Sequence, residues 1–431
     1  MNPTKHQDDL RPGASTTSRI NIALSAAVFT LSSLTYFALP NEGFEGNAEI
    51  LILPLLFFGI VVVLMLLSPK RWPSRGSLWG GEGSAVVWLL PIFTLLPSLF
   101  SSYGRSFQYW ILDSAVLILC RLYGARVPLR DVVEGLFWSG VLVIASVLFF
   151  AGELLLDAIN TLSRFVAFGF HPNTLAFILG TFYPVALWQL IAGRLFKKIL
   201  AGFCALACLL IIFLASSRGS LVAVLASSVI AGALYCIHKK RFKLLFVTPV
   251  LLCFLIGISL NGSALDTVWQ WMDQILQLSS GDRGIGSGFS GRLEEWRATW
   301  VLLLRGIWIY GNGARSSDAF PFPVDNGYLV LLYDLGIVPF CLVVGRFIRI
   351  LARAFRNYVQ TGASIDLILF FLLLSFLLNN LTARFLFGVG NTSSLFAILL
   401  LASPWATLSA ARLMPSRPLP GNAPNAGTVP A

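Results

Sequence analysis

The chain has 431 residues, of which 56% are hydrophobic and 12% charged, and its mean hydropathy is +0.78. This composition exposes too much apolar surface for a soluble globular protein and indicates an integral membrane protein. The six cysteines include no CxxC pair and no histidine cluster accompanies them. Neither a disulfide framework nor a zinc site is therefore predicted.

Apolar runs of membrane-spanning length recur along the chain between charged segments. A helix needs roughly 20 residues to cross about 30 Å of hydrocarbon, and about twelve runs approach that length. We therefore expect an all-α integral membrane protein with about twelve transmembrane helices. The predicted spans cover residues 20–39, 48–67, 85–100, 106–120, 132–151, 173–192, 197–215, 219–237, 242–260, 326–345, 366–383 and 392–411. The short third and fourth spans are joined by either a loop or a re-entrant turn.

These spans and their flanking charges predict the topology. Residues 1–19 form a tail, 20–260 hold spans one to nine, 261–325 form a large outer loop, 326–411 hold spans ten to twelve, and 412–431 form a proline-rich tail that we expect to be disordered. Most of the 31 basic residues, including every lysine, fall on one side when the N-terminus is cytoplasmic. The positive-inside rule thus predicts that both termini are cytoplasmic. The net charge of +11 reflects this topology, so no nucleic-acid partner is expected.

The basic residues that remain on the outer side are all arginines. A planar guanidinium with paired N–H donors suits phosphate and carboxylate oxygens, so the set favours an anionic ligand. Any one of them can instead be an arginine that snorkels or stabilises the end of a loop. The nine are Arg105, Arg164, Arg218, Arg283, Arg292, Arg297, Arg305, Arg315 and Arg384.

Two of these arginines occupy unusual positions. Arg218 lies between two spans with almost no loop, so its guanidinium is expected at the membrane boundary, where charge is costly and indicates function. Arg292 falls in the first turn of a helix predicted over residues 291–305. A cation there opposes the helix dipole unless an anion binds at the same helix start. The alternative for Arg292 is a solvated side chain.

Acid and amide side chains near the outer face are candidate partners. Asp325 and Asn326 open the tenth span, where Asp325 is either a general base or a helix cap. Asn380 and Arg384, at i and i+4 on the eleventh span, are expected to share a helix face. They belong either to the site or to polar contacts inside the bundle.

The large outer loop is predicted to contain interfacial helices. Residues 266–278 carry Trp269 and Trp271 in an amphipathic pattern, so this helix is expected to place its tryptophans at headgroup depth. A glycine-rich stretch connects it to the helix over 291–305.

Several motifs are missing from the sequence. There is no P-loop, no DxD pair and no HExxH, and His171 is the one histidine expected on the outer side. We therefore expect no metal ion and no cofactor. Two acids have no assigned role. Asp334 is expected to face a different side of the helix from Asp325. Asp113 lies within a predicted span, and its partner cannot be identified from the sequence.

Four patches, in this order, resemble the O-antigen ligase and Wzy-type polymerase superfamily of bacterial polysaccharide assembly. They are Arg164 with Gly169-Phe170-His171-Pro172-Asn173, then Ser217-Arg218-Gly219, then Ser290-Gly291-Arg292 with Trp296 and Tyr310-Gly311-Asn312-Gly313, and finally Asp325-Asn326 followed after nine residues by Gly336. The resemblance covers roughly residues 160–345 and the number of spans. Ligases carry a histidine where this chain has Asp325, and an acid there looks more like the exopolysaccharide and O-antigen polymerases.

The resemblance implies a GT-C-like fold and a metal-independent, inverting glycosyltransferase at the periplasmic face of the bacterial inner membrane. The implied donor is an undecaprenyl-diphosphate-linked glycan, and the acceptor is a lipid-linked repeat unit or lipid A core. Asp325 is implied as the catalytic base. Arg218, Arg292 and Arg164 would bind the diphosphate. Membrane lipids and a chain-length regulator are further implied partners, and the residues that would assist are Arg384, Arg315, Asn326 and His171.

Two other functions are compatible with the sequence. A ligase would transfer a finished glycan to lipid A core or to a protein. A flippase for an anionic lipid-linked glycan would line its path with arginines. The absence of an internal repeat and the gathering of arginines on one face argue against a transporter. A flippase would also keep its function after Asp325→Asn.

Overall fold

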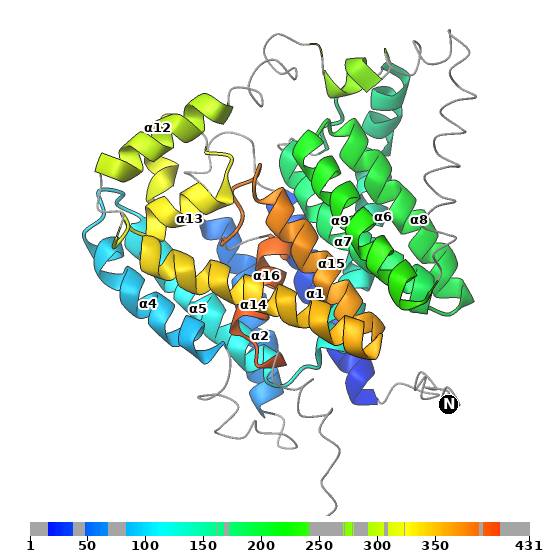
Figure 1. The fold of residues 1–431 in the computed structure, drawn as a ribbon, viewed down its shortest axis with the longest axis horizontal. Helices are drawn as coiled ribbons and strands as arrows, with labels where there is room; N and C mark the ends of the chain where they lie inside the picture. Colours follow the sequence, from blue (N-terminus) through cyan, green and yellow to red (C-terminus); the bar gives the residue numbers. More distant parts are fainter. Residues whose placement is uncertain are drawn as a thin grey trace, which may run out of the picture.

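The computed structural model describes residues 16–37, 48–67, 83–161, 163–167, 172–240, 270, 272–277, 279, 292–305, 309–322, 324–387 and 391–405, and no strand occurs among them (Figure 1). The helices are α1 (Thr16–Phe37), α2 (Ala48–Leu67), α4 (Ser84–Leu99), α5 (Ser106–Gly124), α6 (Leu129–Thr161), α7 (Pro172–Ala192), α8 (Leu195–Leu214), α9 (Arg218–His238), α12 (Arg292–Arg305), the 3₁₀ helix η2 (Ser316–Ala319), α13 (Gly327–Leu335), α14 (Ile337–Thr361), α15 (Ser364–Asn379) and α16 (Thr392–Ala402).

Most predicted spans coincide with one helix, but the tenth does not. The prediction of a single span over 326–345 is wrong, because α13 ends at Leu335 and a new helix begins after Gly336. Gly336 has a φ of 84°, a conformation that glycine adopts without strain and other residues rarely do. The eleventh span ends at Asn379, and the helix of the twelfth ends at Ala402, both earlier than predicted. The ninth, over 242–260, lies outside the described residues.

The helical composition is that of a multi-pass membrane protein. Within the described residues, α6, α7, α8 and α9 are long and apolar enough to cross a bilayer, by length and composition. Shorter apolar helical segments are Leu55–Leu64, which is part of α2, and the helices α4, α15 and α16. The count of twelve spans stays a prediction.

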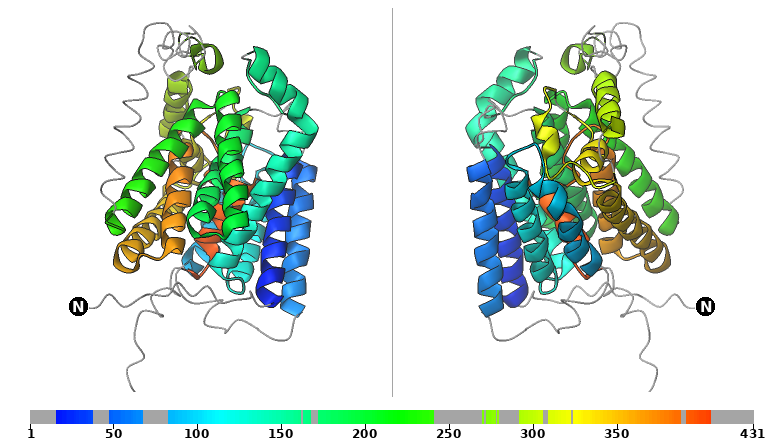
Figure 2. Two further views of the ribbon diagram at one scale, coloured as in Figure 1. Left: turned by 90° about the vertical axis from the view of Figure 1, so that its right-hand side faces the viewer. Right: turned by 90° about the vertical axis from the view of Figure 1, so that its left-hand side faces the viewer.

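One end of the bundle gathers the connections that follow α4, α6, α8 and α15, together with residues 309–327 (Figures 1 and 2). Phe165 N donates to Leu214 O at 2.8 Å, which joins the connection after α6 to the end of α8. Ala314 N donates to Ser98 Oγ at 3.0 Å, which joins residues 309–322 to the end of α4. We call this end of the bundle the site end, because the candidate residues described below lie there.

The opposite end carries many of the basic residues predicted to be cytoplasmic. Lys197 forms an ion pair with Glu134 there. The buried Arg121 donates from Nη1 to Ala402 O at 2.9 Å, at the end of α16. These contacts hold helix ends together at the end of the bundle opposite the site end. The cytoplasmic location of this end stays a prediction of the positive-inside rule.

Candidate active site

Arg292 and Asp325, 33 residues apart in the chain, form an ion pair at the site end. Arg292 Nη2 lies 2.9 Å from Asp325 Oδ2, and Arg292 Nε lies 3.2 Å from the same oxygen. The two side chains are 18% and 28% exposed, respectively. The pair is therefore partly shielded from water yet open to a ligand, and a charge-assisted contact of this kind is stronger than one between neutral groups.

The helix that carries Arg292 begins at this residue, close to the predicted start. Glu294 and Glu295 in its first turn match the positive end of the helix dipole. Arg292 opposes that dipole, so an anion is expected beside it. Asp325 supplies this anion, so Arg292 is not the solvated arginine of the alternative interpretation.

Asn326, rather than Asp325, caps α13. Its Oδ1 accepts hydrogen bonds from Tyr328 N and Leu329 N, both at 3.1 Å. Asparagine is among the preferred caps because its side chain satisfies N–H groups that lack a partner inside the helix. The interpretation of Asp325 as the cap is therefore wrong, and its carboxylate is directed to Arg292 instead.

Two adjacent asparagines at the end of α15 connect the starts of two other helices. Asn379 Oδ1 accepts from Ser220 Oγ at 3.0 Å, in the first turn of α9. Asn380 O accepts from Gly327 N at 2.9 Å, in the first residue of α13. Because α9 begins with Arg218 and α13 directly follows the Arg–Asp pair, the end of α15 holds both groups of candidate residues at the site end.

Arg384 does not share a helix face with Asn380, contrary to the prediction, because α15 ends at Asn379. Arg384 lies in the following turn, where its Nη1 is 3.4 Å from Asp318 Oδ1. Asp318, which the sequence analysis did not single out, thus makes a second arginine–aspartate pair. No local sequence pattern indicates it, since it lies in a short outer turn among serines.

The turn that carries Asp318 rests on a buried acid. Asp334 accepts hydrogen bonds from Ser316 Oγ at 3.0 Å, from Ser317 N at 2.8 Å and from Ser317 Oγ at 3.1 Å. A buried carboxylate with three donors fixes the position of the chain around it. Asp334 thus lies under η2, apart from Asp325, and positions the second arginine–aspartate pair.

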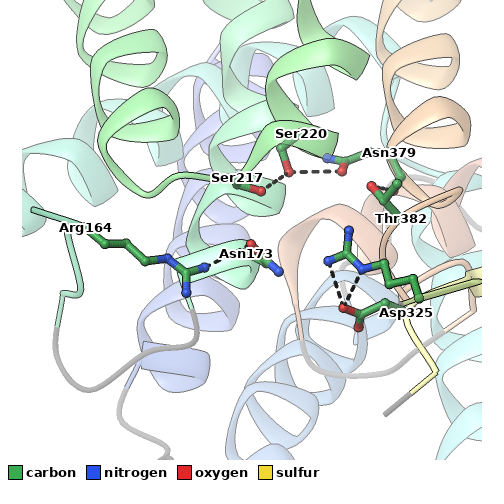
Figure 3. A network of polar contacts seen from close by, with 8 residues as sticks. Arg164, Asn173, Ser217, Ser220, Asp325, Asn379 and Thr382 are labelled. Carbon is green, nitrogen blue, oxygen red and sulfur yellow. Dashed lines mark hydrogen bonds and ion pairs between the residues drawn. The ribbon is translucent and has the colours of Figure 1, made fainter. Parts of the chain in front are cut away.

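The start of α9 meets the turn after α15 at very close range. A Cβ atom on Gly219 would overlap Thr382 Oγ1 and lie 2.8 Å from Thr382 Cβ. Beside this contact Ser217 Oγ donates to Ser220 Oγ at 3.1 Å, which continues to Asn379 (Figure 3). The glycine after Arg218 therefore permits the approach on which the site end depends.

Gly219→Ala is expected to destabilise the protein by about 1–3 kcal/mol, the usual cost of overpacking a close contact. The matched control is Gly232→Ala on the same helix, where a Cβ would meet no atom within 4 Å. Thermal unfolding in detergent compares the two variants. Adding Thr382→Gly to Gly219→Ala should restore most of the loss; equal melting temperatures for both single variants would contradict the steric explanation.

Arg164 approaches the same region from the connection between α6 and α7. Its Nε donates to Ala215 O at 3.0 Å and its Nη2 to Asn173 Oδ1 at 3.3 Å. In the view of Figure 3, Arg164 and Asn173 lie on one side and Asp325 on the other. Arg218, the first residue of α9, is half-buried and follows α8 after three residues, as its position between spans predicted.

The remaining predicted site residues either make other contacts or lie outside the described residues. The Arg315 guanidinium stacks over the Tyr109 ring, with Cζ 4.5 Å from the ring centroid, and is the charged neighbour of Asp113. Arg315 therefore contacts α5, and its role as an assisting site residue stays a prediction. His171, Trp269 and Trp271 lie outside the described residues, as does the glycine-rich stretch; residues 272–276 of the predicted interfacial helix are helical.

A second carboxylate stands beside the Arg292–Asp325 pair. Burial and the neighbouring Asp325 raise the pKa of Glu295, although Arg292 acts in the opposite direction. Glu295 lies in the first turn of α12, one turn from Arg292. Within the described part of the chain, no group of three or more histidine, cysteine or acidic side chains is arranged to hold a metal ion.

Comparison with known proteins bears on the middle of the chain. Residues 203–344 match the sequence model of a family described as O-antigen ligase (Wzy_C). The matched segment contains Arg218, Arg292 and Asp325, whereas Arg164 and Arg384 lie outside it. No curated protein matches the chain. The resemblance inferred from the sequence is thus confirmed, over the segment that runs from α8 into α14.

Proposed function

We propose that this protein, which is similar to O-antigen ligases over residues 203–344, is an inverting, metal-independent glycosyltransferase. It would join glycans carried on undecaprenyl diphosphate at the periplasmic face of a bacterial inner membrane. Polymerisation of lipid-linked repeat units into O-antigen or exopolysaccharide is the reaction we favour. The observation that carries the proposal is the Arg292–Asp325 pair, held at the same end of the bundle as Arg218 and Arg164.

Asp325 is the proposed general base. The oxygen of an acceptor hydroxyl attacks the anomeric carbon of the donor sugar, and the bond from that carbon to the diphosphate oxygen breaks. The hydroxyl proton passes to the Asp325 carboxylate, and undecaprenyl diphosphate leaves with the electron pair. Attack opposite to the leaving group inverts the anomeric configuration. The partial exposure of Asp325 supports this role, because the acceptor must reach it.

Arginines are the proposed stabilisers of the leaving diphosphate. Fixed cations that face developing negative charge are among the largest contributions to catalysis. Arg292 and Arg218 would supply two of them and Arg164 a third, with Arg384 assisting from the turn joined to the start of α13. Asn326 would act indirectly by fixing that start, and Arg315, which stacks on Tyr109, stays a proposed assisting residue.

The ion pair between Asp325, the proposed base, and Arg292, a proposed diphosphate-binding residue, affects the order of donor binding and proton transfer. In the structure, Arg292 binds Asp325. An arriving diphosphate carries more negative charge than one carboxylate and competes for the same N–H donors. Donor binding would therefore release the Asp325 carboxylate for the acceptor hydroxyl.

The nearer alternative is a ligase that transfers glycan to lipid A core or to a protein. The description of the matching family favours it, whereas an aspartate at position 325 in place of a histidine favours a polymerase. The distant alternative is a flippase. Transport of a lipid-linked glycan breaks no covalent bond, so it does not require a general base such as the Asp325 carboxylate.

The test is a deletion strain complemented with wild type, Arg292→Ala or Asp325→Ala, with expression verified for each. Polysaccharide length is read on gels of surface and secreted glycan. Loss of long polymer with single repeat units still transferred would support a polymerase. Absence of glycan on lipid A core, with long lipid-linked chains accumulating, would indicate a ligase; normal glycan from both variants would refute the proposed site.

A further inference from the structure

The helix that carries Arg292 has two different faces. Thr299 and Leu303 are buried, and they lie on the side of α12 that includes Arg292 and packs on the protein. Leu293, Trp300 and Leu304, at i, i+7 and i+11, form a stripe on a neighbouring side, because 3.6 residues make one turn. We call these three residues the α12 stripe.

The α12 stripe is apolar and uncovered within the described part of the chain. Leu293 is 41% exposed, Trp300 48% and Leu304 62%. Arg297 is also exposed and follows the stripe on its outer border, between it and the side that carries Glu294 and Val301. An apolar stripe with a tryptophan and a bordering arginine is the pattern of a helix that lies in a membrane interface, where tryptophan sits at headgroup depth and arginine reaches lipid phosphate.

The position of α12 in the fold agrees with this pattern. The helix starts at the Arg292–Asp325 pair and runs outward, to the edge of the bundle above α4 (Figure 1). The chain that follows returns to the end of α4, where Ala314 N binds Ser98 Oγ. Leu96 and Phe100, at that end of α4, are 62% and 83% exposed, so the apolar surface of the bundle continues up to the level of α12.

We propose that α12 lies on the outer leaflet of the membrane, with the α12 stripe at the acyl boundary and Arg297 at the lipid phosphates. The partner of this surface is the lipid itself. Because Arg292 is on the same helix, the contact with lipid holds its guanidinium near the plane of the headgroups. That depth is where the diphosphate of a membrane-anchored donor lies, and this last step rests on the proposed function.

Spin labels on α12 test its position without measuring activity. Single cysteines at 293, 300 and 304, in a background without the native cysteines, are labelled in nanodiscs of phosphatidylethanolamine and phosphatidylglycerol. Labels on the α12 stripe should be accessible to oxygen and shielded from a water-soluble nickel chelate. Labels at Glu294 and Val301 should show the reverse. If all five labels were equally accessible to the nickel chelate, the proposal would be overturned. That result is expected if the α12 stripe binds a protein partner and not lipid.

A pair of matched variants tests the consequence for the donor. Leu304→Glu and Val301→Glu add the same charge to exposed positions of one helix, three residues apart, and neither removes a buried side chain. Leu304→Glu should lower the rate of transfer from a long-chain lipid donor at least about tenfold, because apolar contact is lost and a charge enters the acyl boundary. The rate of Val301→Glu should stay near that of wild type. Equal rates for the two variants would refute the role in holding Arg292 at depth. If wild type transfers no glycan, the proposed function fails, whereas the spin-label result still decides where α12 lies.

Discussion

Asp325→Asn is expected to lower the rate of glycan transfer by about 10²- to 10⁴-fold, the usual contribution of a positioned base. Asparagine has nearly the same shape, and its amide oxygen can still accept hydrogen bonds from Arg292. The fold and the approach of α12 to α13 should therefore persist while the proton acceptor is lost. The measurement is product formation from purified lipid-linked donor by the protein in nanodiscs, with donor in excess.

Asp318→Asn is the matched control for this variant. Asp318 is also paired with an arginine at the site end, and its side chain is 14% exposed against 28% for Asp325. Weakening one such partly exposed pair should cost less than about fivefold in rate, since exposed ion pairs contribute ~1 kcal/mol or less. Equal losses in the two variants would mean that Asp325 is not the base. An unchanged rate of product formation in Asp325→Asn would likewise refute the assignment of Asp325 as the base.

Arg292→Ala is expected to slow transfer about a hundredfold, which corresponds to ~3 kcal/mol of barrier for one lost donor to a developing anion. Arg292→Lys should lie between this variant and wild type. Lysine keeps the charge but not the two N–H groups that now face Asp325 in a fixed plane. The loss should appear in kcat, because the contact strengthens as the diphosphate departs.

Arg305→Ala provides the control for charge alone. Arg305 is exposed at the other end of α12, so its removal changes the charge of the helix by the same amount far from Asp325. We expect a rate close to that of wild type. A loss as large as that of Arg292→Ala would show that the overall charge of the outer segment matters, rather than a specific contact at the helix start.

The helices were largely predictable because the length of an apolar run reports directly on a buried or lipid-facing helix. The break at Gly336 could not be predicted. The hydropathy of residues 326–345 is the same whether they form one straight helix or two helices joined by a turn. Gly336 packs closely against Gly311, since a Cβ on Gly336 would lie 2.6 Å from Gly311 N. That contact joins segments far apart in sequence, and hydropathy carries no information about it.

The candidate site was predictable one residue at a time but not as pairs. Arg218 and Arg292 could be identified because their positions are costly without an anion. Their partners depend on tertiary structure: Asp325 reaches Arg292 from the segment that precedes α13, and Arg384 pairs with Asp318 from the turn that follows α15. Two consecutive asparagines in an apolar run were visible in the sequence, but their roles follow from where the helix stops.

The hydrogen bonds made by Asn379 and Asn380 also set an order for the biogenesis of the protein. Arg218 and then Asp325 leave the ribosome before α15 does. Until α15 has been synthesised, the starts of α9 and α13 lack the two residues that join them. A nascent chain that ends within α14 therefore enters the membrane with the two halves of the site unconnected, and the site is completed only when the last helices are inserted.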